Sequence, residues 1–212
     1  MVRTFVFNHY GVNCYVLGDD KTDACAIVDP ACNNDAEFNT LVSFIEASRL
    51  KVEAVMLTHP HVDHLAGLRK VCKHYSLPAI LHSEGVEVLL EAPLIAPSMG
   101  FAIDDMDDVE IEAKSDGYLF AVGECEIECR YTPGHCPGSF SYVVHRDKMV
   151  FTGDALFHFS VGRTDLPGGN YELLIDGIKR QILSLPDDYA ILPGHDLQSM
   201  VWKERRYNPF LT

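Results

Sequence analysis

The sequence predicts an α/β protein whose core is two sheets with helices on both outer faces. Two observations support this: short apolar runs typical of strands occupy both halves of the chain, and helical apolar spacing recurs between and after them. With 47% hydrophobic and 23% charged residues the composition is globular, so we expect residues 1–212 to form one domain. The pattern alone leaves other α/β arrangements open.

The first half of the chain begins with three apolar runs separated by polar turns, which are typical of antiparallel strands. Apolar residues then recur at helical spacing in residues 36–50, and a second helix is expected at 64–75. Strands are expected at residues 4–7, 13–17, 24–28, 53–57 and 79–81.

The second half opens with an acidic stretch, residues 93–115, which we expect to be an irregular surface excursion over one end of the sheet. Strand-like runs return after it, and two segments, residues 171–183 and 199–206, have helical character. Strands are expected at residues 118–121, 126–131, 139–144, 149–151 and 189–192.

Charge and composition disfavour several classes of partner. The formal net charge of −14 would repel nucleic acid and anionic membranes. No apolar stretch is as long as a membrane span, and residues 1–5 do not resemble a signal peptide, so we expect a soluble, cytoplasmic protein. Seven cysteines, an odd number with no C-x-x-C pair, predict buried thiols rather than disulfides or a thiolate zinc site.

Four apolar runs each end in a polar cluster that contains glycine or histidine. If these runs are strands, their ends gather at one edge of a sheet, where open α/β folds place ligand sites. Gly134, Gly153 and Gly194 would let the backbone turn sharply or approach closely just before a donor. The clusters are Thr58-His59-Pro60-His61-Val62-Asp63-His64, Thr132-Pro133-Gly134-His135, Thr152-Gly153-Asp154 and Pro193-Gly194-His195.

The spacing of the donors predicts two adjacent metal positions. His59 and His61 are two residues apart, so on extended backbone they project to the same side, whereas Asp63 and His64 point differently. The first metal is expected to take His59, His61 and His135, the second Asp63, His64 and His195, with Asp154 bridging the two.

Two metal ions, with zinc as the expected element, fit these donors because histidine nitrogen and carboxylate oxygen both suit zinc. Iron and manganese accept the same donors. A lone histidine is more often a surface or core residue than a ligand, but four donors within residues 59–64 have little structural purpose without an ion. The histidines left out for this reason are His9, His74, His82, His145 and His158.

The ordered donors resemble the ligand set of the metallo-β-lactamase superfamily, and the resemblance covers nearly the whole chain. It implies a four-layer αββα sandwich with the metal site at one edge between the two sheets. Asp154, together with Asp63 and His64, is similar to the glyoxalase II-type hydrolases; lactamases generally carry cysteine at the later position, which disfavours penicillin hydrolysis. Residues 162–169 and 204–210 are similar to short, single-domain bacterial members of that group.

The resemblance implies a hydrolase that acts on a small-molecule thioester such as S-lactoylglutathione through a metal-bound hydroxide. Asp63 and Asp154 are the expected catalytic residues, and Asp63 would also orient the nucleophile. Arg163 could hold a substrate carboxylate with two hydrogen bonds, or order its loop by pairing with Asp165. Cys136 is expected to be buried beside the ligands rather than catalytic.

Three points stay open. Persulfide dioxygenases look similar and use one iron held by two histidines and an aspartate, here His59, His135 and Asp154. A metal-binding module without catalysis would need a blocked cleft, and residues 93–115 could partly cover the opening. Full-length glyoxalase II has a basic C-terminal domain for glutathione, and the short sequence after His195 does not imply glutathione recognition.

Overall fold

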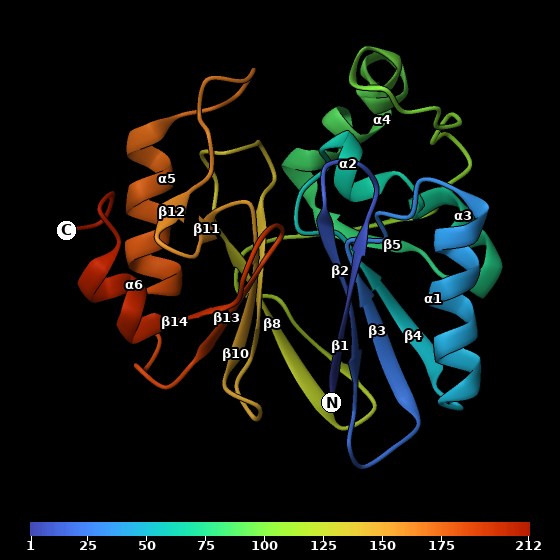
Figure 1. Ribbon diagram of the computed structural model, residues 1–212, viewed down its shortest axis with the longest axis horizontal. Coiled ribbons are helices and arrows are strands. Elements are labelled where there is room, and N and C mark those ends of the chain that lie inside the picture. The colour runs from blue at the N-terminus through green and yellow to red at the C-terminus, as the bar shows by residue number, and fades with distance from the viewer.

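The fold is a four-layer αββα sandwich, which confirms the predicted fold class. The computed structural model describes residues 1–212 and contains two six-stranded sheets. Figure 1 shows the sheets in the middle of the molecule, with helices covering the outer face of each. The helices on one outer side are α1 (Asp35–Ala47) and α3 (Leu68–Tyr75), and those on the other are α5 (Tyr171–Gly177) and α6 (Val201–Tyr207).

The first sheet is mixed and has the order β1-β2-β3-β4-β5-β6. Its first three strands are antiparallel, as predicted, and the remaining pairs are parallel. In β2, Cys14 and Val16 pack toward the outer helices while Tyr15 and Leu17 face the second sheet, because successive side chains alternate along a strand. The strands are β1 (Val2–Phe7), β2 (Val12–Gly18), β3 (Ala24–Val28), β4 (Lys51–Met56), β5 (Ala79–His82) and β6 (Ile111–Lys114).

The second sheet has the order β14-β13-β10-β9-β8-β7, and only β10 and β13 pair in parallel. Val150 and Ile191 pack with residues of α5 and α6, whereas Phe151 and Leu192 join the core between the sheets. A small hairpin of β11 (Leu156–Phe157) and β12 (Ser160–Val161) follows β10. The strands are β7 (Leu119–Val122), β8 (Cys125–Tyr131), β9 (Phe140–Val144), β10 (Met149–Gly153), β13 (Ala190–Pro193) and β14 (Ser199–Met200).

The prediction of an irregular excursion at residues 93–115 is wrong in part. The segment begins inside helix α4 (Val86–Ile95), which follows the turn η1 (Ser83–Gly85) and continues as η2 (Ala96–Met99). Its last residues form β6, an edge strand paired with β5. Pro93 lies within α4. Because proline usually interrupts a helix, the sequence pattern did not indicate one here. The edge strand is only half-buried, so its sequence lacks a continuous apolar run.

The helix predicted at residues 64–75 is two helices, α2 (Val62–Leu65) and α3, separated at Gly67. A Cβ atom at Gly67 would lie 2.8 Å from the carbonyl oxygen of Pro30, in the loop after β3. Only glycine allows this close packing between the two helices. Residues 171–183 are helical, but α5 ends at Gly177 and continues as one π-helical segment, η3 (Ile178–Ile182). None of these helices is long and apolar enough to cross a membrane.

Candidate metal centre

The four clusters predicted from the sequence meet at one edge of the sandwich. β4 leads into the first cluster, and β8, β10 and β13 lead into the other three, so donors from both sheets face one another across the gap between them. Gly194 shows how closely the backbone approaches: an added Cβ would lie 2.3 Å from Asp154 Oδ1 and 2.6 Å from His64 Cε1. No side chain fits there, so Gly194 allows the close backbone approach that the sequence predicts before a donor.

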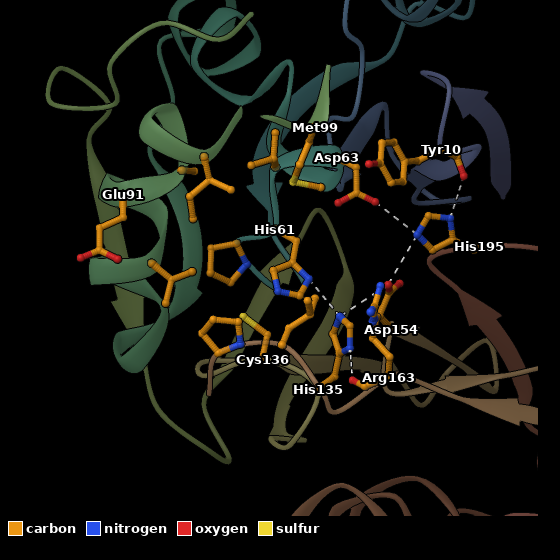
Figure 2. A pocket seen from close by; sticks show the side chains of 17 residues that line it. Tyr10, His61, Asp63, Glu91, Met99, His135, Cys136, Asp154, Arg163 and His195 are labelled. Atoms are coloured by element: carbon orange, nitrogen blue, oxygen red, sulfur yellow. Dashed lines mark hydrogen bonds and ion pairs between the residues drawn. The ribbon is translucent and has the colours of Figure 1, made fainter. Parts of the chain in front are cut away.

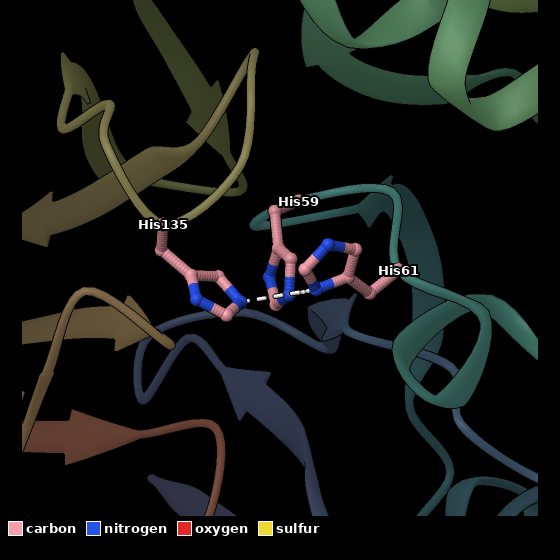
Figure 3. Close-up of side chains that lie close together, drawn as sticks. All are labelled: His59, His61 and His135. Atoms are coloured by element: carbon pink, nitrogen blue, oxygen red, sulfur yellow. Dashed lines mark hydrogen bonds between the residues drawn. The ribbon is translucent and has the colours of Figure 1, made fainter. Parts of the chain in front are cut away.

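Three histidines form the first group of donors. His59 Nε2 lies 3.1 Å from His61 Nδ1, and His135 Nε2 lies 3.0 Å from the same nitrogen (Figure 3). His61 extends from the turn before α2, and His135 reaches across from the loop after β8. The three ring nitrogens therefore converge on one point between the sheets.

Asp63, His64 and His195 form the second group. His64 Nε2 lies 3.3 Å from His195 Nε2, and His195 Nε2 lies 3.4 Å from Asp63 Oδ2. Asp63 and His64 are consecutive residues of α2, so their side chains leave the helix in different directions. One donor atom of each nevertheless lies close to His195. This grouping is the one predicted for the second metal.

Asp154 lies between the two groups. One of its oxygens, Oδ1, is 3.2 Å from His64 Nε2, and the other, Oδ2, is 3.6 Å from His135 Nε2 and 3.5 Å from His195 Nε2. Oδ1 is buried and accepts no hydrogen bond. A buried carboxylate oxygen without a partner is unfavourable in a folded protein unless a cation or a proton donor reaches it.

The outer ring nitrogens show which nitrogen of each histidine faces the centre. His135 Nδ1 lies 2.8 Å from the carbonyl oxygen of Arg163, and His195 Nδ1 lies 3.1 Å from that of Tyr10. A carbonyl oxygen only accepts hydrogen bonds, so both Nδ1 atoms carry the proton. In the neutral rings Nε2 then has a free lone pair directed at the other donors (Figure 2).

Asp29, directly after β3, orients two further rings, those of His64 and His59. Its Oδ2 accepts a hydrogen bond from His64 Nδ1 at 3.0 Å and from the hydroxyl of Thr58 at 2.7 Å. Since that hydroxyl donates to Asp29, it is left to accept from His59 Nδ1, 3.1 Å away. One buried carboxylate thus orients a histidine in each group.

His61 Nδ1 can donate a proton to only one of the two Nε2 atoms that face it, those of His59 at 3.1 Å and His135 at 3.0 Å, so at least one lone pair there has no partner. The Nε2 lone pairs of neutral His64 and His195 likewise face each other over 3.3 Å. Such an arrangement is repulsive in a protein interior unless a cation or extra protons lie between the nitrogens. Together with the unpartnered oxygen of Asp154, it fits metal ions held by nitrogen and carboxylate oxygen, a donor set that suits zinc and also iron.

The ionisation of the two groups differs. Burial lowers the pKa of His61 to about 4, and burial with the neighbouring His64 lowers the pKa of His59 well below its usual value. Burial also opposes the charged form of His64 and His195, but nearby carboxylates, chiefly that of Asp154, outweigh it. They raise the pKa of His64 well above its usual value and that of His195 to about 9.

A cavity of about 590 Å³ opens onto the cluster (Figure 2). His61, Asp63, His135, Asp154 and His195 line one end of it, and residues of α4 and η2 line one wall, with Met99 near Asp63 and Glu91 at the end far from His195. Part of the 93–115 segment therefore does border the opening, as expected, although it leaves the cavity open.

Arg163 and Cys136, the two other residues singled out in the sequence, both line the cavity. The Arg163 side chain is 61% exposed and makes two hydrogen bonds of 2.7 Å to Asp165, so its guanidinium is already paired. Cys136 is buried, and burial raises the pKa of its thiol to about 12, which agrees with a thiol that is protonated rather than catalytic.

Known proteins match this chain over nearly its whole length. Residues 8–195 match the sequence model of the family described as the Metallo-beta-lactamase superfamily. Hydroxyacylglutathione hydrolase GloC of Haemophilus influenzae is 33% identical over 94% of this chain and 92% of that protein. Among solved structures, the B3 metallo-beta-lactamase BLEG-1 superposes with a TM-score of 0.89 at 32% identity, covering 100% of both chains. The protein TTHA1623, solved in a di-iron-bound form, superposes with a TM-score of 0.87 at 29% identity over 99% of this chain and 100% of that one.

Proposed function

The chain belongs to the metallo-beta-lactamase superfamily, and we propose that it hydrolyses small thioesters at a centre of two metal ions, with zinc as the expected element. The observation that carries this proposal is Asp154, whose two oxygens lie between the two histidine groups. A carboxylate so placed suits a bridging ligand, and adjacent ions suit hydrolysis. The relative named as a hydroxyacylglutathione hydrolase supports a thioester as the substrate class.

The proposed ligands form two sets of three that share Asp154. Iron is the second candidate element, because the same donors accept it and a similar protein was solved with two irons. The first position would be held by His59, His61 and His135, the second by Asp63, His64 and His195, and Asp154 would bridge them.

When bound, such ions lower the pKa of water towards neutrality and polarise a carbonyl. The chain's own residues supply position and orientation. Asp63 borders the cavity, and although burial raises the pKa of its carboxyl, His64 and His195 outweigh this and lower it, so it is ionised. An ionised carboxylate there can accept a hydrogen bond from the attacking water and aim it at the thioester. The departing thiolate is a stable anion, so no general acid is needed for it.

A β-lactam is the second candidate substrate, favoured by the similarity to BLEG-1, a B3 metallo-beta-lactamase. It would present its amide carbonyl to the same ligands. We rank it below a thioester because an amide nitrogen needs a proton in order to leave, whereas a thiolate leaves without one.

The test is metal analysis of the purified protein together with parallel assays on S-lactoylglutathione, a penicillin and glutathione persulfide. We expect about two zinc ions per chain and turnover of the thioester. One iron per chain with oxygen consumption on the persulfide would contradict the proposal and indicate a dioxygenase. Turnover of the penicillin alone would move the assignment to a lactamase.

A further inference from the structure

The wall of the cavity that faces the metal centre is one face of a helix and its extension. Val88, Ala92 and Ile95 of α4 and Met99 of η2 are spaced by four, three and four residues, so they lie along a single line. All four are apolar. Glu91, which lies beside this line, is the only charged residue that the wall presents to the cavity.

Other parts of the cavity lining are apolar as well. Pro60 and Val62, which flank His61, form the part nearest the donors, and Leu166 and Pro167 lie in the loop that also carries Arg163. A polar group placed here would lose its hydrogen bonds to water without gaining others. Hydrocarbon placed here would be removed from water, which is favourable.

The charges around the cavity disfavour an anionic group. Glu91 lies at the opposite end of the cavity from His195 (Figure 2). Arg163 is the only lysine or arginine that lines the cavity, and its guanidinium is already paired with Asp165. A substrate carboxylate near the wall would meet a like charge and no free cation.

We propose, building on the thioesterase function above, that the wall of α4 and η2 binds a linear, uncharged hydrocarbon acyl chain. The preferred substrates are then thioesters of apolar acyl groups rather than the small polar lactoyl group. The acyl side is assigned to the wall because a biological thiol carrier such as glutathione is polar and carries carboxylates, which an apolar wall beside Glu91 disfavours. The chain of the acyl group stays neutral throughout.

The first test compares acetyl, butanoyl and hexanoyl thioesters of N-acetylcysteamine, a small uncharged thiol, with the metal-loaded protein. We expect kcat/KM to rise by up to about fourfold for each added methylene. Ile95→Asn should reduce the advantage of hexanoyl over acetyl by about fivefold. Leu94→Asn is the matched control, because the adjacent Leu94 is 83% exposed and does not line the cavity.

The second test concerns charge. Glu91→Gln should raise kcat/KM for the succinyl thioester, which carries a terminal carboxylate, by about two- to fivefold relative to that for hexanoyl. Glu87→Gln is the control, since Glu87 is exposed on the same helix and lies outside the cavity.

The binding of thioethers separates this inference from the proposed function. S-ethyl and S-hexyl N-acetylcysteamine cannot be hydrolysed, so calorimetry measures their affinity whether or not the protein is a thioesterase. Tighter binding of the hexyl compound that Ile95→Asn abolishes supports the wall, even if no thioester is turned over. Thioester turnover without any dependence on acyl length would contradict the proposed role of the wall but not the proposed thioesterase function. A length dependence found only on the thiol side of acetyl thioesters overturns the assignment to the acyl group.

Discussion

The two groups of histidines in the cluster differ in how ready they are to accept a metal ion. In the first group, burial keeps His59 and His61 neutral, with the pKa of His61 lowered to about 4. In the second group, the carboxylates around His64 and His195 stabilise their charged forms and raise the pKa of His195 to about 9. His59 and His61 therefore offer lone pairs at neutral pH, whereas His64 and His195 hold protons that a metal must displace.

This difference arises from where the carboxylates lie. Asp29, Asp63 and Asp154 all raise the pKa of His64, whereas the largest influences on His59 after burial are the other histidines. The same carboxylates that hold protons in the metal-free protein would attract a cation strongly once those protons leave. We therefore expect the two positions to fill in order, the three-histidine position first.

The largest effect is expected from Asp154→Asn, because this residue is proposed to serve both positions. An amide has no negative charge and presents only one acceptor oxygen. We expect less than one tightly bound metal at the second position and a fall in kcat of more than about 100-fold, beyond the range that loss of an outer contact produces. Metal content by mass spectrometry and thioester assays measure both.

Asp196→Asn is the matched control for this change. Asp196 directly follows His195, is exposed, and makes no side-chain hydrogen bond. It should bind two metals and keep its activity. If Asp154→Asn also retained two metals and full turnover, the bridging assignment would be wrong.

A smaller effect, and one that tests how far the two positions are independent, is expected from Asp29→Asn and Thr58→Val. Asp29 orients His64 directly and His59 through Thr58, so its amide should weaken metal binding at both positions by about 10- to 100-fold. Thr58→Val removes the hydroxyl and with it the contact to His59 and the hydrogen bond to Asp29, but Asp29 keeps its contact to His64. This variant should weaken chiefly the first position.

Metal-buffered titrations report the two affinities, and thermal unfolding of the metal-free variants separates positioning from general stability. A purely structural role for Asp29 would lower the unfolding temperature without changing either affinity.

The pH dependence of metal uptake should distinguish the groups next. Because carboxylates raise the pKa of His195 to about 9 and that of His64 well above its usual value, both hold protons at neutral pH. Affinity at the second position should therefore rise as pH increases, by about tenfold per pH unit for each proton released. The donors His59 and His61 have lowered pKa values and should lose affinity only in more acidic solution. Zinc titrations at pH 6, 7 and 8 with measured proton release test this; equal slopes for the two metals would contradict it.

Much of the centre could be predicted because its information is local. Four donors fall within residues 59–64, and each remaining donor follows an apolar run that forms a strand. The contribution of Asp29 is different, since it contacts Thr58 and His64 from 29 and 35 positions away. One signal was available: like the donors, Asp29 directly follows a strand, β3, but a single aspartate before proline is typical of a turn.

The backbone carbonyls of Tyr10 and Arg163 could not be predicted at all, because every residue has one and only the fold determines where it points. Helix α4 was missed for another reason. Its apolar residues occur on both its cavity-lining and its exposed sides, as Leu90 and Leu94 show, so no clear helical stripe marks it. The parts that sequence reasoning missed are therefore Asp29 and the two backbone carbonyls, among the outer contacts of the donors, and the apolar cavity wall of α4 and η2.

The smallest effect is expected from Arg163→Gln, although this residue contacts the first group. It reaches His135 through its main-chain carbonyl, which the substitution keeps, while its side chain pairs with Asp165 in solvent. We expect metal affinity at both positions and kcat/KM for an uncharged thioester to stay within about twofold of the parent protein, as for most surface changes. Titration and assay of this variant beside Asp165→Asn, which frees the guanidinium, check the point. The contrary result would be a lower kcat/KM for Arg163→Gln, but not for Asp165→Asn, and only with thioesters that carry a carboxylate. The guanidinium would then bind substrate rather than order its loop, and the cavity would contain a cation available to an anionic substrate.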